Sequence, residues 1–335
     1  MISRYLNGDP LPWLTDGENP AVTYLSKMEL IDGEDPERLY TELISSPLYE
    51  YFNKESSGNI LGDRKHPDIL YRGSVWHFLL AAESGFDSRT DFIRTTGDFI
   101  FSRLQAADGG FSFDCNPLLS VGCRTGNIVS ALVRSGIKDE RTESGISWIV
   151  RNQRGDGGWL HCPFRGGAEV IKLVLMKKPG KGHHDDSDEK IPSCPVATFA
   201  CMSALVEISD PRYSDSIKKA ADYFLRKNFK ESMINLKARC GLVTDPLSPG
   251  YPVMSQFDII SILRLIVAAD KLNISSAGEI FNYIMTFQGR SGRWYSKNKN
   301  HGFLREKAGE SRWVTLNALR VIKGISCGKF QLEKA

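Results

Sequence analysis

One short word occurs three times along this chain. A glutamine is followed four residues later by glycine and six residues later by a large aromatic residue, as in LQAADGGF, NQRGDGGW and FQGRSGRW. The copies begin at Gln105, Gln153 and Gln288, and each follows an apolar helical segment. A fixed word at a fixed place in a helix–turn unit is typical of a repeat architecture, so it constrains the whole fold.

Each part of the word has a structural role that its chemistry predicts. The glycine lets the chain turn with a positive φ after the helix. The glutamine amide can bond backbone groups left free at a helix end, and the aromatic ring can cover the turn. We therefore expect the words to stabilise the packing of neighbouring repeats and not to form a catalytic site.

Along the chain two kinds of helical segment alternate, and strand signals are almost absent. One kind is apolar on nearly all sides: 74–84, 125–136, 195–208, 256–269 and 312–324. The other kind is amphipathic: 36–52, 88–104, 140–152, 212–228 and 275–287. Helices that are apolar all round must be buried, whereas helices with a polar face can cover them. The alternation predicts an all-α fold, an α/α toroid with an inner ring of parallel helices inside an outer ring, in five to six helix pairs.

The length is compatible with one large domain, because a chain of this size can bury a substantial core. We expect residues 1–335 to form a single α/α-toroid domain, with residues 1–35 as an N-terminal extension packed on it. Residues 164–192 read as a polar insertion loop. The long interval between the second and third words leaves room for a degenerate copy near residues 226–232.

Composition argues against several classes of protein. The 43 basic and 40 acidic residues leave a formal charge of only +3, so we expect no nucleic-acid partner. No apolar run is long enough to span a bilayer, and the N-terminus lacks a signal-peptide pattern. We expect a cytoplasmic protein without a transmembrane segment, and peripheral membrane contact stays open. Seven scattered cysteines favour metal binding or burial over a disulfide framework.

The three words resemble the QW motif, Q-x3-G-x-W, of the terpene cyclase and protein prenyltransferase superfamily, which is built from prenyltransferase and squalene oxidase repeats. The resemblance in helix alternation extends from about residue 60 to residue 325. It implies an α/α toroid whose central cavity, in characterised members, holds an isoprenoid chain. A hydrophobic or isoprenoid small molecule is therefore the expected partner, while the sequence leaves a partner subunit unknown.

Two familiar chemistries of the superfamily are matched poorly. The chain has no D-x-D-D, the motif that supplies the acid in class II terpene cyclases. The nearest text, HHDDSDEK at 183–190, lies in the insertion and reads as a solvated charge run, with a role in binding Mg²⁺ and diphosphate as the less favoured alternative. Cys123 lies about where prenyltransferase β-subunits carry a zinc-binding cysteine, but Val121 stands in place of their aspartate, and their later histidine is not matched.

Topology nevertheless brings four residues of metal-ligand type to one rim. In a toroid all inner helices start at the rim where the outer-helix turns also lie, and Cys123 and Cys194 begin successive inner helices. His161 and Cys162 follow the second word. Three thiolates, with or without an imidazole, suit tetrahedral Zn²⁺, which would activate a thiol substrate. Buried thiols without a metal are the alternative.

The remaining candidates lie near the starts of apolar segments. Asp258 and Glu310 either favour a helix N-terminus electrostatically or line the cavity mouth as acid, base or ligand anchor. Arg72 also precedes an apolar segment, but the positive N-terminal end of a helix does not stabilise a cation. A role in binding an anion is therefore favoured for Arg72. These three residues are the candidate catalytic residues. We expect His77 to be a core histidine, and four cysteines to be packing or surface residues: Cys115, Cys201, Cys240 and Cys327.

The leading functional hypothesis is an isoprenoid- or lipid-handling toroid, with a zinc-assisted prenyl-type transferase as its enzymatic form. Its main rival is a non-catalytic module that binds a hydrophobic ligand or a peptide. A third hypothesis is a terpene-cyclase-like enzyme without the D-x-D-D acid, which would use Asp258 or an acid from 185–188.

Overall fold

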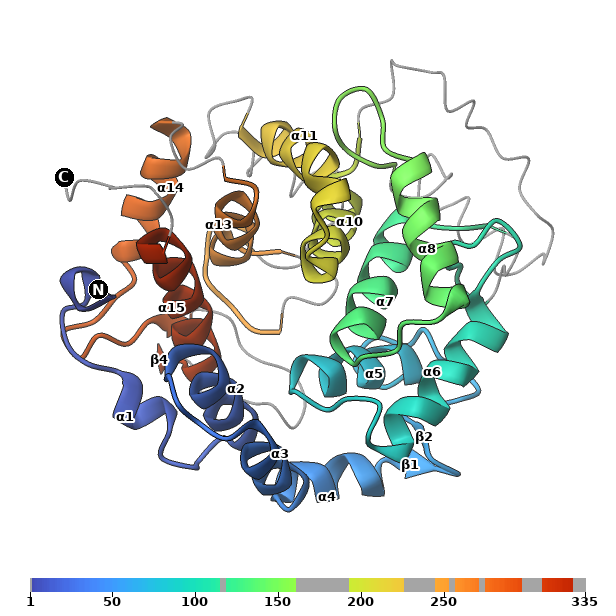
Figure 1. Ribbon diagram of the computed structural model, residues 1–335, viewed down its shortest axis with the longest axis horizontal. Coiled ribbons are helices and arrows are strands. Elements are labelled where there is room, and N and C mark those ends of the chain that lie inside the picture. The colour runs from blue at the N-terminus through green and yellow to red at the C-terminus, as the bar shows by residue number, and fades with distance from the viewer. Residues whose placement is uncertain are drawn as a thin grey trace. The chain divides into compact units, whose positions relative to one another are not determined.

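The computed structural model describes residues 2–114, 119–160, 193–225, 245–252, 257–270, 275–296 and 309–327. The predicted insertion at 164–192 and the degenerate copy near 226–232 lie outside these residues. Regular structure in the described part is almost entirely helical, which confirms the all-α class (Figure 1). The chain forms two compact units, one of residues 52–223 and one of residues 1–51 with 224–335.

Buried helices form the centre of the 52–223 unit. They are α5 (Ser74–Glu83), α7 (Gly122–Arg134) and α10 (Pro195–Ile208), and α7 packs against both of the others (Figure 1). Nine successive residues of α5, from Ser74 to Ala82, are buried, so this helix has no solvent face. These helices confirm the inner segments that the sequence predicts.

Amphipathic helices cover the buried ones in the same unit. Helix α6 (Asp91–Leu104) packs against α5, and α8 (Glu140–Arg151) packs against α7. After α10, the short 3-10 helix η2 (Pro211–Tyr213) leads into α11 (Ser214–Leu225). Buried and amphipathic helices therefore alternate along the chain, as the inner and outer layers of an α/α toroid require.

The second unit brings the two ends of the chain together. Helix α15 (Arg312–Cys327) packs against α13 (Ile259–Ala268) and also against α2 (Pro20–Leu30), which comes from the N-terminal extension. The other elements of the two units are smaller or peripheral: η1 (Ile2–Tyr5), α1 (Leu11–Leu14), α3 (Pro36–Ile44), α4 (Pro47–Lys54), α14 (Ser275–Met285), and the antiparallel pairs β1 (Ser56–Ser57) with β2 (Ile60–Leu61) and β3 (Tyr295–Ser296) with β4 (Gly309–Glu310).

One predicted helix is wrong in extent. The segment 36–52 forms two helices, α3 and α4, which are separated at Ser45 and Ser46. Pro47 begins the second helix, and a proline both lacks the N–H that a helix interior needs and disfavours the helical conformation in the residue before it. The sequence pattern predicted one helix because both α3 and α4 bury apolar side chains, so the amphipathic spacing does not change at the break.

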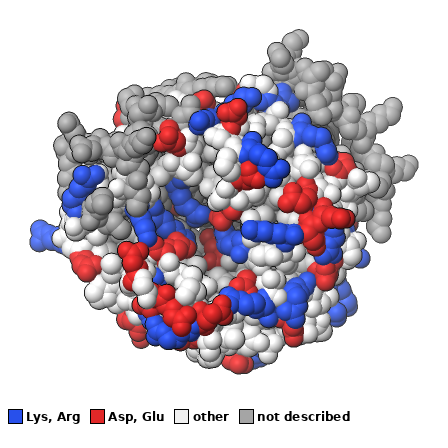
Figure 2. Space-filling model, in the orientation of Figure 1, with Lys and Arg blue, Asp and Glu red and all other residues white. Residues whose placement is uncertain are grey.

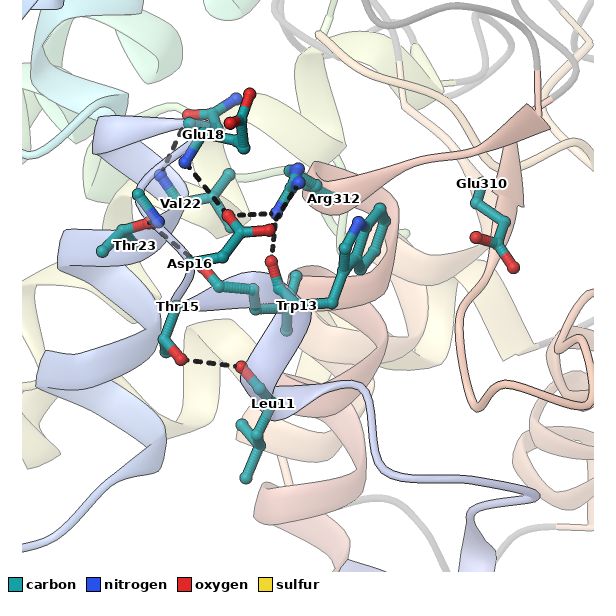
Figure 3. A network of polar contacts seen from close by, with 12 residues as sticks. Leu11, Trp13, Thr15, Asp16, Glu18, Val22, Thr23, Glu310 and Arg312 are labelled. Atoms are coloured by element: carbon teal, nitrogen blue, oxygen red, sulfur yellow. Dashed lines mark hydrogen bonds and ion pairs between the residues drawn. The ribbon is translucent and has the colours of Figure 1, made fainter.

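Arg293 and Arg312 hold the N-terminal extension against the last helix. Figure 3 shows Arg312 between Trp13 and Asp16, and its guanidinium nitrogens lie 2.8 and 2.9 Å from the two Asp16 carboxylate oxygens. The Arg312 guanidinium also lies 4.5 Å from the Trp13 ring centroid, and the Arg293 guanidinium lies 4.4 Å from the same centroid. Cation–π contacts and a bidentate ion pair therefore fix this segment.

Charges of both signs are mixed on the surface. Figure 2 shows Lys and Arg side chains interspersed with Asp and Glu side chains across the visible face, without a broad field of one sign among the described residues. No described helix has both the length and the apolar character that crossing a membrane requires.

Each of the three words forms a tight turn. Gly109, Gly157 and Gly292 have φ values of +93°, +87° and +77°. A Cβ on these glycines would lie 2.7, 2.3 and 2.0 Å from a backbone carbonyl oxygen, respectively. Both the left-handed backbone and the close approach exclude a side chain, so glycine is required at this place.

The aromatic residue of each word pairs with the start of the next buried helix. The backbone N–H groups of Phe111, Trp159 and Trp294 donate to threonine hydroxyls at 2.8, 3.2 and 2.9 Å; the acceptors are Thr125, Thr198 and Thr315. The carbonyls of the same aromatic residues accept from the residue just before the helix: Val121, Cys194 and Ser311. The word thus sets where α7, α10 and α15 begin.

The glutamines connect each turn to the next amphipathic helix, with one exception. Gln105 Nε2 donates to the carbonyls of Gly109 and Arg141, at the start of α8, and Gln153 makes the equivalent pair of bonds. Gln288 Nε2 has no hydrogen-bond partner among the described residues, and its Oε1 instead accepts from the Asn7 N–H at 3.0 Å. N-terminal residues therefore stand where an amphipathic helix stands in the first two copies.

Small residues allow α7 and α10 to touch through their backbones. A Cβ on Gly126 of α7 would lie 2.3 Å from the carbonyl carbon of Ala200 and 2.4 Å from the nitrogen of Cys201 in α10. The Cys201 thiol is fully buried and donates to the Gly122 carbonyl at 3.3 Å, which agrees with its predicted packing role. The core of this unit depends on this close approach.

We predict that Gly126→Ala lowers the free energy of unfolding by about 1–3 kcal/mol, because the added methyl overpacks a backbone contact and outweighs the better helix propensity of alanine. Gly155→Ala is the matched control, since no heavy atom lies within 4 Å of its Cβ position. Urea unfolding of both variants checks the prediction. Equal losses in the two variants would contradict it.

Candidate functional site

A buried ion pair lies at the start of α7. Arg124, in the first turn of that helix, is 5% exposed, and its Nη2 donates to Asp68 Oδ1 at 2.5 Å. Asp68 lies in the loop before α5, and its Oδ2 accepts from the Asp114 N–H at 2.7 Å. Because removing two charges from water is costly, such a pair persists only with good geometry and further hydrogen bonds, which these contacts supply.

Two aromatic rings flank the Arg124 guanidinium. Its Cζ lies 4.5 Å from the Phe113 ring centroid and 5.6 Å from that of Trp76, both within the range of cation–π attraction. The Trp76 indole N–H donates to the Asp68 carbonyl at 3.0 Å, which fixes the ring. Trp76 and Arg124 are each the third residue of their helices, so equivalent positions of α5 and α7 supply the ring and the cation.

Most donors of the Arg124 guanidinium have no partner in the described part of the chain. Asp68 is its hydrogen-bond partner among the described residues, through Nη2, although arginine offers five N–H groups. The first turn of α7 contains no acidic residue, and its N-cap, Val121, provides no capping side chain. The positive end of this helix therefore adds to the guanidinium charge. The arrangement suits an anionic or polar group that lies beside aromatic rings.

Asp68 is electrostatically unusual. Burial raises the pKa of its carboxyl above the ordinary value, although Arg124 and the Asp114 N–H favour the charged form. Perturbed carboxyls of this kind are typical of functional sites. Sequence reasoning missed both Asp68 and Arg124, because neither belongs to a recognisable motif. The signal that could have found them is their position before α5 and at the start of α7, the rim where the cysteines were sought.

The described residues include two of the four predicted metal ligands. Cys123 is half-buried in the first turn of α7. Cys194 is buried at the N-cap of α10, where its N–H donates to the Trp159 carbonyl at 2.7 Å. His161 and Cys162 lie outside the described residues. Within the described ranges no three His, Cys, Asp or Glu residues cluster in a way that could hold a metal, so the zinc site stays a prediction.

Asp258 caps a helix. Its Oδ1 accepts from the Ser261 N–H at 2.8 Å, and the Ser261 hydroxyl accepts from the Asp258 N–H at 2.9 Å, which is a capping box at the start of α13. Its Oδ2 accepts from the Gly250 N–H at 3.0 Å. Burial raises the pKa of this carboxyl, against these hydrogen bonds. The structure shows the N-terminal role that the sequence offered as one alternative, and the catalytic role stays a prediction.

Glu310 belongs to the turn of the third word. In the first two words an aspartate of the word accepts from a serine that lies two residues before the next helix: Asp108 from Ser120 at 2.5 Å, and Asp156 from Ser193 at 2.6 Å. In the third word the two residue types have exchanged places, so Ser291 donates to Glu310 at 2.8 Å. The hydrogen bond from Arg293 lowers the pKa of Glu310, and the same Arg293 guanidinium lies over the Trp13 ring.

Arg72 and His77 differ in surroundings. Arg72 is exposed, and its guanidinium makes no ion pair with a described residue; its anion-binding role stays a prediction. His77 is buried, with Nδ1 3.3 Å from the Gly73 carbonyl oxygen, and burial lowers its pKa. His77 follows its helix N-cap by four residues, as Thr125 and Thr198 follow theirs. It is therefore the core histidine that the sequence predicts.

Comparison with known proteins finds likeness only at the level of structure. No protein-family model and no curated protein sequence matches the chain. The Lin0763 protein of Listeria innocua is similar with a TM-score of 0.46 and 11% identity, over 94% of this chain and 84% of that chain. The type II terpene cyclase MstE from Scytonema is similar with a TM-score of 0.44 and 11% identity, over 94% of this chain and 88% of that chain. A variant of that cyclase in complex with its product merosterolic acid A is similar with a TM-score of 0.32 and 12% identity, over 94% of this chain and 98% of that chain.

The raised pKa of Asp258 predicts a pH dependence of stability. The carboxyl ionises at an ordinary 3.8 in the unfolded chain and at a higher pH in the folded chain, so between these values the folded state binds more protons. The free energy of unfolding must then fall as the pH rises from 3.8 through the folded pKa. We expect the difference between wild type and Asp258→Asn to show this fall in urea titrations.

Asp156→Asn is the matched control for this titration. Burial alone would raise the pKa of Asp156, but hydrogen bonds from Ser193 and Gly158 lower it overall. Its contribution to stability should therefore be present above 3.8 and be lost as the pH falls towards the lowered folded pKa, the opposite slope. Parallel curves for the two variants would refute the assignment.

Proposed function

We propose that this chain handles an isoprenoid or another lipophilic small molecule with an anionic end, and that Arg124 binds that end. The observation that supports the proposal is the nearly buried guanidinium of Arg124, which uses one donor on Asp68 and has others without a partner among the described residues. Trp76 and Phe113 offer apolar surface beside it. A cation with free donors next to aromatic rings suits a molecule with a charged head and a hydrocarbon body.

Asp68 would adjust the charge of this site. A bound anion competes with the Asp68 carboxylate for the guanidinium, and its negative charge would raise the pKa of Asp68 further. A proton taken up by Asp68 would release Arg124 to the anion and would remain beside the ligand. In an enzymatic form of the protein, this carboxyl would be a general acid in place of the missing D-x-D-D.

The zinc-assisted transferase is the finer form of the proposal. Cys123 and Cys194 begin the neighbouring helices α7 and α10, and with His161 and Cys162 they would form a donor set whose chemistry fits Zn²⁺. Zinc would supply activation of a thiol substrate. If the protein binds no zinc and catalyses no reaction, the Arg124 site would instead serve the rival function, that of a non-catalytic module that binds hydrophobic ligands.

We predict that the protein binds farnesyl diphosphate more tightly than farnesol, because only the diphosphate carries a negative charge that can pair with Arg124. Arg124→Gln should weaken farnesyl diphosphate binding about tenfold or more, the effect of losing charge-assisted hydrogen bonds. Isothermal titration calorimetry measures both ligands. Arg94→Gln, which removes an exposed arginine of α6, is the control and should bind as wild type does.

A second variant separates binding from folding. Arg124→Gln alone leaves the half-buried Asp68 carboxylate without its partner, which is destabilising. The double variant Arg124→Gln/Asp68→Asn removes both charges and should fold, yet still bind weakly. Wild-type affinity in the folded double variant would refute the role of Arg124.

Metal analysis tests the transferase. We expect the purified protein to contain stoichiometric zinc, which either Cys123→Ser or Cys194→Ser removes, because a tetrahedral site does not survive the loss of a thiolate. Plasma mass spectrometry gives the metal content. A metal-free wild type whose stability is unchanged in both variants would leave only the ligand-binding form of the proposal.

A further inference from the structure

An exposed apolar pair lies at the tip of the loop before α5. Ile69 and Leu70 are each 43% exposed. The other large apolar residues with comparable exposure in the described part stand singly in the sequence: Met28, Val150 and Tyr295. Single exposed apolar residues need no explanation, but an adjacent pair on a loop tip favours an interaction. We call residues 64–72 the rim loop.

The backbone of the rim loop holds this pair outward. The Ile69 carbonyl accepts from the N–H groups of Arg72 at 3.1 Å and Gly73 at 2.7 Å, which closes a tight turn. At the base of the turn, a Cβ on Gly73 would lie 2.1 Å from the Pro67 carbonyl oxygen. Tyr71 adopts a left-handed φ of +61°, an unfavourable conformation for a bulky residue. The turn therefore cannot fold back easily to bury Ile69 and Leu70.

Positive charge surrounds the apolar pair. Arg64, Lys65 and Arg72 are exposed, and none forms an ion pair with a described residue. Two acidic side chains lie close by: Asp63 accepts from the backbone N–H groups of Lys65 and His66, and Asp68 binds Arg124. The rim loop therefore presents three exposed cations, without ion-pair partners among the described residues, around two exposed aliphatic side chains.

We propose that the rim loop docks this protein reversibly on an anionic lipid bilayer. Apolar side chains at the tip would enter the interface between headgroups and acyl chains, while the cations meet the negative surface. A protein partner is less favoured, because stable protein interfaces need a much larger area than one loop tip supplies. The inference goes beyond the proposed function and does not depend on Arg124 binding a ligand.

Sedimentation with vesicles tests the docking. The full chain is mixed with sucrose-loaded vesicles of phosphatidylcholine alone, or with about a quarter phosphatidylserine, in about 0.1 M salt. We expect binding to the anionic vesicles that falls steeply in about 0.5 M salt, where surface charges are screened. Absence of binding, or equal binding to neutral vesicles in either salt, would overturn the proposal.

Matched variants locate the contact. Ile69→Ser/Leu70→Ser should reduce the partition coefficient about tenfold or more, and Arg64→Gln/Lys65→Gln should reduce it roughly fivefold for each charge removed. Val150→Ser, which removes an exposed apolar residue of α8, should leave it unchanged. Circular dichroism confirms that each variant is folded. An equal loss in Val150→Ser would overturn the assignment to the rim loop, and so would a dimer that forms without vesicles and is lost in Ile69→Ser/Leu70→Ser.

Discussion

The hydrogen bond from the aromatic N–H of each word to a threonine of the next buried helix is the interaction on which the rest depends. Phe111, Trp159 and Trp294 make it over 2.8 to 3.2 Å, and each also accepts a backbone N–H from the residue before that helix. Together these bonds satisfy groups that a buried helix end would otherwise leave unpaired. Every buried helix that follows a word therefore starts at a defined place.

A defined helix start gives the residues around it defined surroundings. The residue two positions before each of these helices carries a hydroxyl or a carboxylate that hydrogen-bonds to the turn of the preceding word. These residues are Ser120, Ser193 and Glu310. Position three within the helix carries Trp76 in α5 and Arg124 in α7, which contact each other. The same scaffold thus yields an acid that closes a turn in one repeat and, in another, a cation whose partner among the described residues is a single carboxylate. The difference lies in side chains and not in backbone.

The candidate site could be predicted only in part. Period and composition predicted the buried helices within a few residues, because a helix that is apolar on all sides has to be buried. The helix starts, where the sequence placed the candidate residues, also carry Arg124 and Asp68. The choice of residues differed, because Asp258 and Glu310 turned out to be held in backbone and turn contacts. Arg124 and Asp68 were missed because a buried ion pair depends on contacts between residues 56 positions apart.

By itself, the sequence determined the helical class, the positions of the turns and the alternation of buried with covering helices. These features follow from local chemistry: glycine at a positive φ, apolar periodicity and the absence of strand patterns. Tertiary structure alone decided which polar residues near the helix starts close a turn and which, like Arg124, pair with a carboxylate far away in the sequence. That distinction depends on the partner each side chain meets across the fold, and the order of residues along the chain does not contain it.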